Sequence, residues 1–164
     1  MSSFSKTFEI RRAQVEDLAE VLRIERTVAE APHWGESIYR DILLQDSGQV
    51  TLNRALFVAV DSERILGFVV AAVVAGQAEL ESIAVDPERR RLGVGRALLD
   101  AIMLWGREAG AREMLLEVRS ANAEARALYD RLGFRETGLR RGYYSDPPDD
   151  AVLMSVSLSN AADL

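Results

Sequence analysis

The residues whose types and spacing best suit a binding role form a short basic loop, Arg90-Arg91-Leu92-Gly93-Val94-Gly95-Arg96. An apolar run precedes the loop and ends at Asp86-Pro87, because proline cannot donate a ladder hydrogen bond and the residue before it avoids the α region. Glycine lets an oxygen-rich group approach the backbone, and the first-turn N–H groups of a following helix lack helical partners. The loop therefore has the chemistry of an anion site, although a tight turn with a solvated basic rim would use the same residues.

Two common phosphate-binding loops do not fit this stretch. The phosphate loop of nucleotide hydrolases requires Gly-Lys-Ser/Thr, which is absent. The dinucleotide fingerprint requires three glycines at fixed spacing, and only Gly93 and Gly95 are present.

Three further side chains have a structural and a chemical interpretation. Glu117 lies within Met-Leu-Leu-Glu-Val, where a buried unpaired carboxylate would be costly. It points either to solvent or an arginine such as Arg119, or into a site as a proton acceptor, and the run alone leaves both open. By their residue types, Tyr129 suits a core tyrosine and Asn122 a helix N-cap.

Composition limits the classes of protein to which this chain can belong. The 164 residues suit one domain, 1–164 with a core of about 8–158, and 48% apolar and 28% charged residues suit a globular protein. The absence of cysteine excludes disulfides, thiolate metal sites and a cysteine nucleophile, and a single histidine, His33, argues against a histidine metal site. The net charge of −6 argues against nucleic-acid binding. No apolar run has membrane-spanning length and no signal-peptide core begins the chain, so we expect a cytoplasmic protein.

Apolar periodicity predicts the elements that must position these residues. Four helices are expected, at 15–29, around 38–43, at 94–109 and at 123–132. Strands are expected at 8–11, 55–60, 64–75, 77–85, 114–118, 134–141 and 152–158, with turns at Asp61-Ser62-Glu63 and at Ser145–Asp150. This order predicts an α+β protein with helices on both faces of one sheet.

Two blocks carry a family resemblance. The segment Arg90–Gly95 resembles the Gln/Arg-x-x-Gly-x-Gly/Ala pyrophosphate loop of the GCN5-related N-acetyltransferases, and Ile83–Pro87 is similar to that family's central strand. The second block, Asn122-x-x-Ala-x-x-Leu-Tyr-x-x-x-Gly-Phe134, resembles the family in the same order along the chain. The resemblance covers Phe8 to Leu158.

The resemblance implies a fold, a donor and a catalytic pair. The fold would be a mixed, mostly antiparallel central sheet with a splayed cofactor cleft beside the ends of the Val85 and Val118 strands. Glu117 would accept a proton from the acceptor amine, and Tyr129 would protonate the departing thiolate. Acetyl-CoA, with no metal, would be held by Ile83, Ala84, Val85, Arg90, Arg91, Leu92, Gly93, Val94, Gly95, Arg96, Asn122 and Tyr129.

Further segments resemble the ribosomal-protein N-terminal alanine acetyltransferases of the RimI type. These segments are Leu116–Arg119, Arg140–Tyr144, Asp150-Ala151 and Met154. The resemblance implies the α-amine of a protein N-terminus, such as that of a ribosomal protein, as acceptor. Candidate acceptor-binding residues are Glu25, Trp34, Tyr39, Tyr143 and Tyr144, although the aromatic ones also suit the core or an ordinary strand pair.

Other functions would give the same blocks. A small-molecule amine or lysine acetyltransferase would differ only in its acceptor, and a regulatory module would bind acetyl-CoA without turnover. The segments 45–53 and beyond 158 are not distinctive. A positively charged acceptor is expected to meet an acidic mouth lined by Glu25, Glu30, Glu36, Asp41 and Asp146–Asp150.

Overall fold

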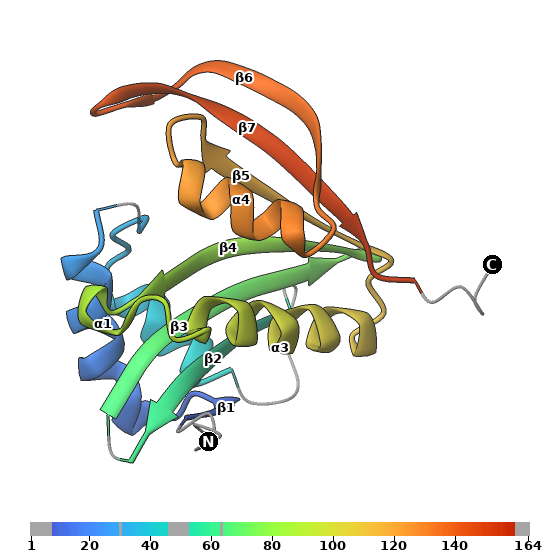
Figure 1. Cartoon of the computed structure of the whole chain (residues 1–164). Helices are drawn as coiled ribbons and strands as arrows, with labels where there is room; N and C mark the ends of the chain where they lie inside the picture. Colours follow the sequence, from blue (N-terminus) through green and yellow to red (C-terminus); the bar gives the residue numbers. More distant parts are fainter. Residues whose placement is uncertain (1–7, 30, 46–52, 63, 160–164) are drawn as a thin grey trace, which may run out of the picture.

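The computed structural model describes residues 8–29, 31–45, 53–62 and 64–159, and its central feature is a seven-stranded sheet (Figure 1). The strand order is β1-β2-β3-β4-β5-β7-β6, and every neighbouring pair is antiparallel except β4–β5. The predicted mixed, mostly antiparallel sheet is therefore confirmed. The strands are β1 (Glu9–Arg12), β2 (Asn53–Asp61), β3 (Arg64–Val74), β4 (Gln77–Val85), β5 (Glu113–Arg119), β6 (Arg135–Ser145) and β7 (Pro148–Ser157).

Helices cover both faces of the sheet, as predicted. On one face α1 (Leu18–Thr27) and α2 (Glu36–Leu43) bury a core around Tyr39 and Phe68. On the other face α3 (Val94–Glu108), with α4 (Ala123–Arg131) near it in Figure 1, packs over a second core. These apolar stripes stabilise the fold and fix where the ends of the helices lie relative to the strands.

The predicted helix at 15–29 is divided. It begins as a short 3₁₀ turn, Val15–Asp17, and continues as α1. Asp17 accepts a hydrogen bond from the Gln14 backbone N–H at 2.7 Å and a forked pair from Arg11 at 2.7 and 3.0 Å. The chain entering α1 is thereby tied to β1.

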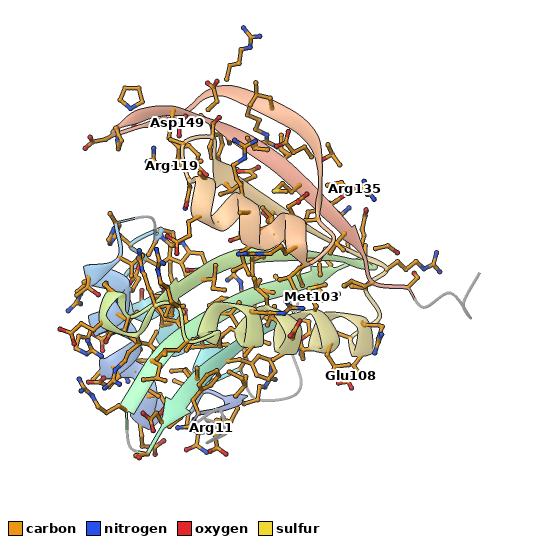
Figure 2. All side chains as sticks on the ribbon, viewed as in Figure 1. Arg11, Met103, Glu108, Arg119, Arg135 and Asp149 are labelled. Atoms are coloured by element: carbon orange, nitrogen blue, oxygen red, sulfur yellow. The ribbon has the colours of Figure 1, made fainter. Side chains whose placement is uncertain are left out.

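The expected turn at Ser145–Asp150 was too long. The strands β6 and β7 pair through Tyr144↔Asp149 and Ser145↔Pro148, so the turn is reduced to Asp146-Pro147. Arg119 donates to the carbonyl oxygens of Pro147 and Asp146 at 2.8 and 3.1 Å and lies 4.1 Å from the Tyr144 ring centroid. In Figure 2, Arg119 and Asp149 lie close together near the tip of the β6–β7 hairpin. This distant arginine lets a polar segment stay in strand pairing.

Some expectations concern positions outside the described residues. These are Glu30 as an acceptor-side residue, Glu63 in the first turn, residues 46–52 and the tail at 160–164. Among the described residues, no helix is long and apolar enough to cross a membrane.

The sheet opens between β4 and β5. Their parallel pairing runs only from Gln77↔Glu113 to Glu79↔Leu115, although the strands continue to Val85 and Arg119. A bulge in β4 opposite Val70 and Ala71 coincides with this divergence, and bulges bend a strand and increase its twist. The predicted opening of the sheet beside the ends of these two strands is confirmed.

Candidate active site

A cleft of about 460 Å³ lies beside the divergence, bounded by the end of β4, the beginning of α3 and the inner side of α4. Of the residues expected to hold a cofactor, all line this cleft except Leu92, whose side chain is 55% exposed. The lining residues that were expected are Ile83, Ala84, Val85, Arg90, Arg91, Gly93, Val94, Gly95, Arg96, Asn122 and Tyr129.

Six further residues line the same cleft without having been predicted: Val28, Arg89, Glu124, Ala125, Leu128 and Arg131. Arg89 adjoins the basic loop, and its place in that arginine run was a signal that could have indicated it. Ala125 and Leu128 follow Asn122 at helical spacing and so share its face of α4. The contribution of Val28 could not be read locally, because it depends on the packing of α1 against the sheet.

Backbone geometry shapes the end of the cleft that lies at the beginning of α3. Gly93 caps α3 in the left-handed region with φ +80°, and Arg91 also has a positive φ of 67°. A Cβ on Gly93 would meet no atom within 4 Å, so glycine is favoured there by backbone conformation rather than by space. The first N–H groups of α3 face this end without helical acceptors. Together with the nearby arginines they suit a pyrophosphate.

The buried Asp86 anchors the approach to this loop. Its carboxylate accepts from the Glu88 N–H at 3.0 Å and lies 3.3 Å from the Arg23 guanidinium. The loop is thereby fixed to α1 as well as to β4.

Tyr129 reaches the cleft from α4 and is only 6% exposed. Burial, together with the neighbouring Tyr144, raises the pKa of its hydroxyl to about 12. The hydroxyl therefore carries its proton at neutral pH and can donate it. Asn122 lines the cleft while its side chain accepts from the Ala125 N–H at 3.2 Å, so the N-cap interpretation is confirmed.

Glu117 belongs to the opposite face of the sheet. Its β5 neighbours Leu116 and Val118 are buried against the α3 side, and alternation turns Glu117 toward the α1–α2 side. Its carboxylate is 24% exposed and lies 3.4 Å from the Arg140 guanidinium, so the arginine it meets is Arg140 and not Arg119. Hydrogen bonding to Glu117, and the charge of that carboxylate, raise the pKa of the Tyr143 hydroxyl.

The pKa values link Tyr144 to both candidate catalytic groups, Glu117 and Tyr129. Burial is the main cause of the raised pKa of the Tyr144 hydroxyl, and the charge of Glu117 raises this pKa further. Tyr144 also raises the pKa of Tyr129, and its ring lies 5.0 Å from the ring of Tyr143, the tyrosine that is hydrogen-bonded to Glu117.

Acidic residues that the sequence analysis did not single out lie beside Glu117. Burial, then the charges of Glu81 and Glu117, raise the pKa of Glu79. Glu81 pairs with Arg54 at 2.9 Å, and Arg54 also lies 6.0 Å from the Trp34 ring centroid. This side of the sheet is therefore acidic because of β4 and β5.

The expected acidic residues of α1 and α2 lie differently. Glu25 is 1% exposed and Glu36 pairs with Arg40, so neither presents a free surface charge. Desolvation raises the pKa of Glu25 despite the Trp34 backbone N–H. Tyr39 is fully buried and its pKa is also raised by desolvation. Glu25 Oε1, the Tyr39 hydroxyl and Ser82 Oγ have no hydrogen-bond partner within the described part of the chain.

The expected hairpin carboxylates face the backbone. Asp149 accepts from the Ala121 N–H at 3.0 Å and Asp150 from the Gly142 N–H at 2.8 Å. The expected Asp41 and Asp146 are exposed, and Glu79, Glu81 and Glu117 add acidic groups along β4 and β5 that were not all expected.

The arrangement suits group transfer across the sheet. A ligand whose anionic part rests at the beginning of α3 would present its other end beside β4 and Tyr129. A second reactant could approach Glu117 from the opposite face, through the gap between β4 and β5. One proton donor and one proton acceptor would then flank the reacting atoms. The described residues contain no group of three side chains suited to a metal ion.

Comparisons with known proteins agree with this geometry. The acetyltransferase (GNAT) family matches residues 15–134. The chain is 35% identical over 152 residues to the [ribosomal protein bS18]-alanine N-acetyltransferase of Escherichia coli K12, covering 92% of this chain and 97% of that protein. It is 32% identical over 166 residues to an N-alpha-acetyltransferase of Sulfurisphaera tokodaii, covering 93% and 95%.

A solved structure extends the similarity to three dimensions. The crystal structure of the ribosomal-protein-S18-alanine N-acetyltransferase from Escherichia coli superimposes with a TM-score of 0.80 and 33% identity, covering 94% of this chain and 96% of that one. The family match spans the basic loop, Glu117 and Tyr129. The expected fold and family are confirmed, and the chain belongs to the GNAT family of acetyltransferases.

Proposed function

We propose that this protein transfers the acetyl group of acetyl-CoA to the N-terminal α-amine of a protein, with an alanine terminus of a ribosomal protein as the preferred acceptor. The observation that carries the proposal is the placement of Tyr129 in the cleft beside the basic loop and of Glu117 on the other face of the divergent strands. The similarity to enzymes named for alanine and N-alpha acetylation supports the choice of acceptor. A ribosomal-protein acceptor would place the reaction in the cytoplasm.

On the donor side, the cleft accounts for an acyl-CoA. Acetyl-CoA supplies an activated thioester. The arginines and first-turn N–H groups beside Gly93 hold its pyrophosphate, and the backbone of Ile83–Val85 aligns the pantetheine arm along β4. Asn122 contacts the same arm, and Tyr129 donates a proton to the leaving thiolate sulfur.

On the acceptor side, Glu117 removes a proton from the incoming ammonium, directly or through one water. An α-amine has an ordinary pKa of about 8, whereas that of a lysine side chain is about 10.4. Deprotonating an α-amine is therefore the easier task for a carboxylate base. The amine nitrogen then bonds to the acetyl carbon while the carbon–sulfur bond breaks. The nitrogen loses its second proton, which restores the Tyr129 hydroxyl by way of solvent, and the proton on Glu117 is the one that is released.

The proposal is tested by measuring free coenzyme A release over a panel of acceptors. The panel contains arginine-bearing and acidic peptides with N-terminal alanine, the same peptides with blocked N-termini, lysine peptides and polyamines. We expect turnover with the free alanine terminus and a preference for the basic peptide. Preference for lysine side chains or polyamines would move the protein to another acceptor class, and acetyl-CoA binding without any turnover would indicate a regulatory module.

A further inference from the structure

Arg140 on β6 is the cation that Glu117 meets in the free protein. One Arg140 nitrogen lies 3.4 Å from Glu117 Oε1, longer than the 2.7–2.9 Å typical of charge-assisted hydrogen bonds. The Arg140 side chain is 55% exposed, and its guanidinium also lies 5.7 Å from the Tyr143 ring centroid. This is a loose, water-accessible pair of the kind that contributes little stability.

The charges around Arg140 do not balance. Glu79, Glu81 and Glu117 lie on this side of the sheet, and Arg54 pairs with Glu81. Arg140 acts on both remaining carboxylates, because it pairs with Glu117 and opposes the rise in the pKa of Glu79. Arg54 also opposes the rise in the pKa of Glu79, so two arginines face three carboxylates. The excess of negative charge would favour the binding of a further cation there.

The backbone of β6 places Arg140 by means of an irregularity. Strand register passes from Arg140↔Ala151 to Tyr144↔Asp149, so three residues of β6 oppose one residue of β7. We call this irregular stretch of β6, residues 140–144, the arch. Gly142 takes a positive φ of 62° within it, and the Gly142 N–H donates to Asp150 at 2.8 Å. The arch brings Arg140 and Tyr143 to the same carboxylate, which regular alternation at this spacing would not do.

We propose that Arg140 is a displaceable counter-ion, which holds Glu117 in the free enzyme and gives way to the ammonium group of the acceptor. The inference rests on the proposed acetylation of α-amines. Arg140 is a positioning residue, because it acts through Glu117 and not on the acetyl group.

This replacement of Arg140 by the acceptor ammonium would also favour product release at the end of the catalytic cycle. The ammonium takes the place of the guanidinium and gives one proton to Glu117, which later passes it to water. The product is a neutral amide, so it no longer competes with Arg140 for the carboxylate. Re-pairing of Arg140 with ionised Glu117 would then favour product release.

The test measures acceptor binding without turnover, by calorimetry in the presence of coenzyme A. Two peptides are compared: one with N-terminal alanine, and its desamino counterpart, which begins with a propionyl group and lacks the ammonium. Arg140→Gln should bind the alanine peptide about threefold to fivefold more tightly, the range expected for removing one exposed competing ion pair. Affinity for the desamino peptide should stay unchanged.

Two further variants separate displacement from a structural effect. Arg140→Lys keeps the competing cation and should bind both peptides as the wild type does. Arg141→Gln removes the neighbouring exposed charge and should leave both affinities unchanged. Equal tightening by Arg141→Gln would show a general charge effect and overturn the proposal.

Other results overturn it as directly. If Arg140→Gln binds both peptides more weakly, Arg140 is a direct peptide ligand. If the ratio of the affinities for the alanine and the desamino peptide is the same in Arg140→Gln as in the wild type, Arg140 has no part in amine binding. Coenzyme A release by the wild type is measured on the same alanine peptide. If the wild type acetylates the peptide and the ratio is unchanged, only this inference fails. If the wild type neither binds nor acetylates it, the proposed function fails, and the inference fails with it.

Discussion

Glu117 and Tyr129 have surroundings that suit opposite proton-transfer roles. Glu117 is partly exposed and its carboxylate lies 3.4 Å from the Arg140 guanidinium, so an amine that arrives from solvent can reach it. Tyr129 is buried, and its pKa of about 12 keeps the hydroxyl protonated throughout the neutral range. Tyr144 contributes to the raised pKa of Tyr129, and the charge of Glu117 contributes to the raised pKa of Tyr144.

Substitution of the base should affect turnover and spare donor binding. We expect Glu117→Gln to lower kcat by roughly 10²- to 10⁴-fold, the usual contribution of a general base. Acetyl-CoA affinity, measured by calorimetry, should be unchanged because Glu117 does not line the cleft. Glu113→Gln, the same change at the other end of β5, is the matched control. Near wild-type turnover by Glu117→Gln would remove Glu117 from the mechanism.

Loss of the Tyr129 hydroxyl should also slow the reaction. Tyr129→Phe keeps the ring that packs 5.7 Å from Phe134, so the protein should remain folded. We expect a lower kcat, and a smaller loss with acyl donors whose leaving thiol is more acidic, because such a thiolate needs less protonation. A deficit that is independent of the leaving group would contradict the assignment.

At the scale of elements, sequence patterns located β3, β4, α3 and α4 closely. Their apolar periodicity is long, and the bounding residues, such as Asp86-Pro87 and Gly93, impose local constraints. The β6–β7 hairpin was misjudged because Ser145–Asp150 is polar, and its pairing depends on Arg119, far away in sequence. The Arg140 contact was missed for the same reason, since it depends on the arch at Gly142.

The site was accordingly predictable in part. The placement of the loop 90–96 beside a cleft could be predicted because its residues are contiguous and the expected anion site depends on backbone. Glu79 and Glu81 could not be predicted as neighbours of Glu117, because their closeness to it depends on the β4 bulge and on the divergence of two strands. Burial of Glu25 and Tyr39 likewise follows from the packing of α1 and α2 on the sheet.

The loop at the beginning of α3 gives a direct binding prediction. Gly93→Asp would force a side chain into a left-handed backbone conformation, and Gly95→Asp would place one against Leu128 and Val85 within the cleft. Both add a negative charge where a pyrophosphate is expected, so calorimetry should detect no acetyl-CoA binding. Gly35→Asp, the same change at the N-cap of α2, should bind normally. Retained affinity in both loop variants would refute the loop assignment.

Helix α1 gives a prediction about stability and pH. Desolvation raises the pKa of Glu25, so folding favours its protonated form. Its contribution to stability is therefore present below its unfolded-state pKa of about 4.3, and it is lost as pH rises through the folded value. We expect Glu25→Gln to raise the free energy of unfolding at pH 8 by about 1 kcal/mol or more relative to wild type.

Denaturant unfolding at pH 4 and pH 8 measures this difference. The gain should shrink at the lower pH, where Glu25 is protonated in the folded protein. Glu36→Gln on the exposed surface of α2 serves as the control and should show little dependence. A gain that is equal at both pH values would mean that Glu25 is not the group responsible.

At the scale of the whole molecule, the proposed function places donor and acceptor on different faces of the sheet. The cleft opens on the α3–α4 face and Glu117 lies on the α1–α2 face, so both reactants can be bound together. The chain contains no cysteine, which excludes a cysteinyl acetyl-enzyme. Direct transfer within a ternary complex is the mechanism this layout favours.

Initial-rate kinetics distinguish the mechanisms. Double-reciprocal plots at several fixed acceptor concentrations should intersect, and incubation with labelled acetyl-CoA alone should leave no label on the protein. The same incubation with enzyme that was denatured beforehand is the control for label that is held non-specifically. Parallel lines, or a stable labelled protein without acceptor, would contradict direct transfer.

The short seam between β4 and β5 has a consequence for hydrogen exchange. Only three residue pairs join the two strands, so β4 amides that lie beyond Glu79 and point away from β3 lack a strand partner. In the empty protein these amides should exchange with deuterium far faster than those of the neighbouring β3. A ligand lying along β4 would supply the missing acceptors, and the slowed amides would map its path residue by residue.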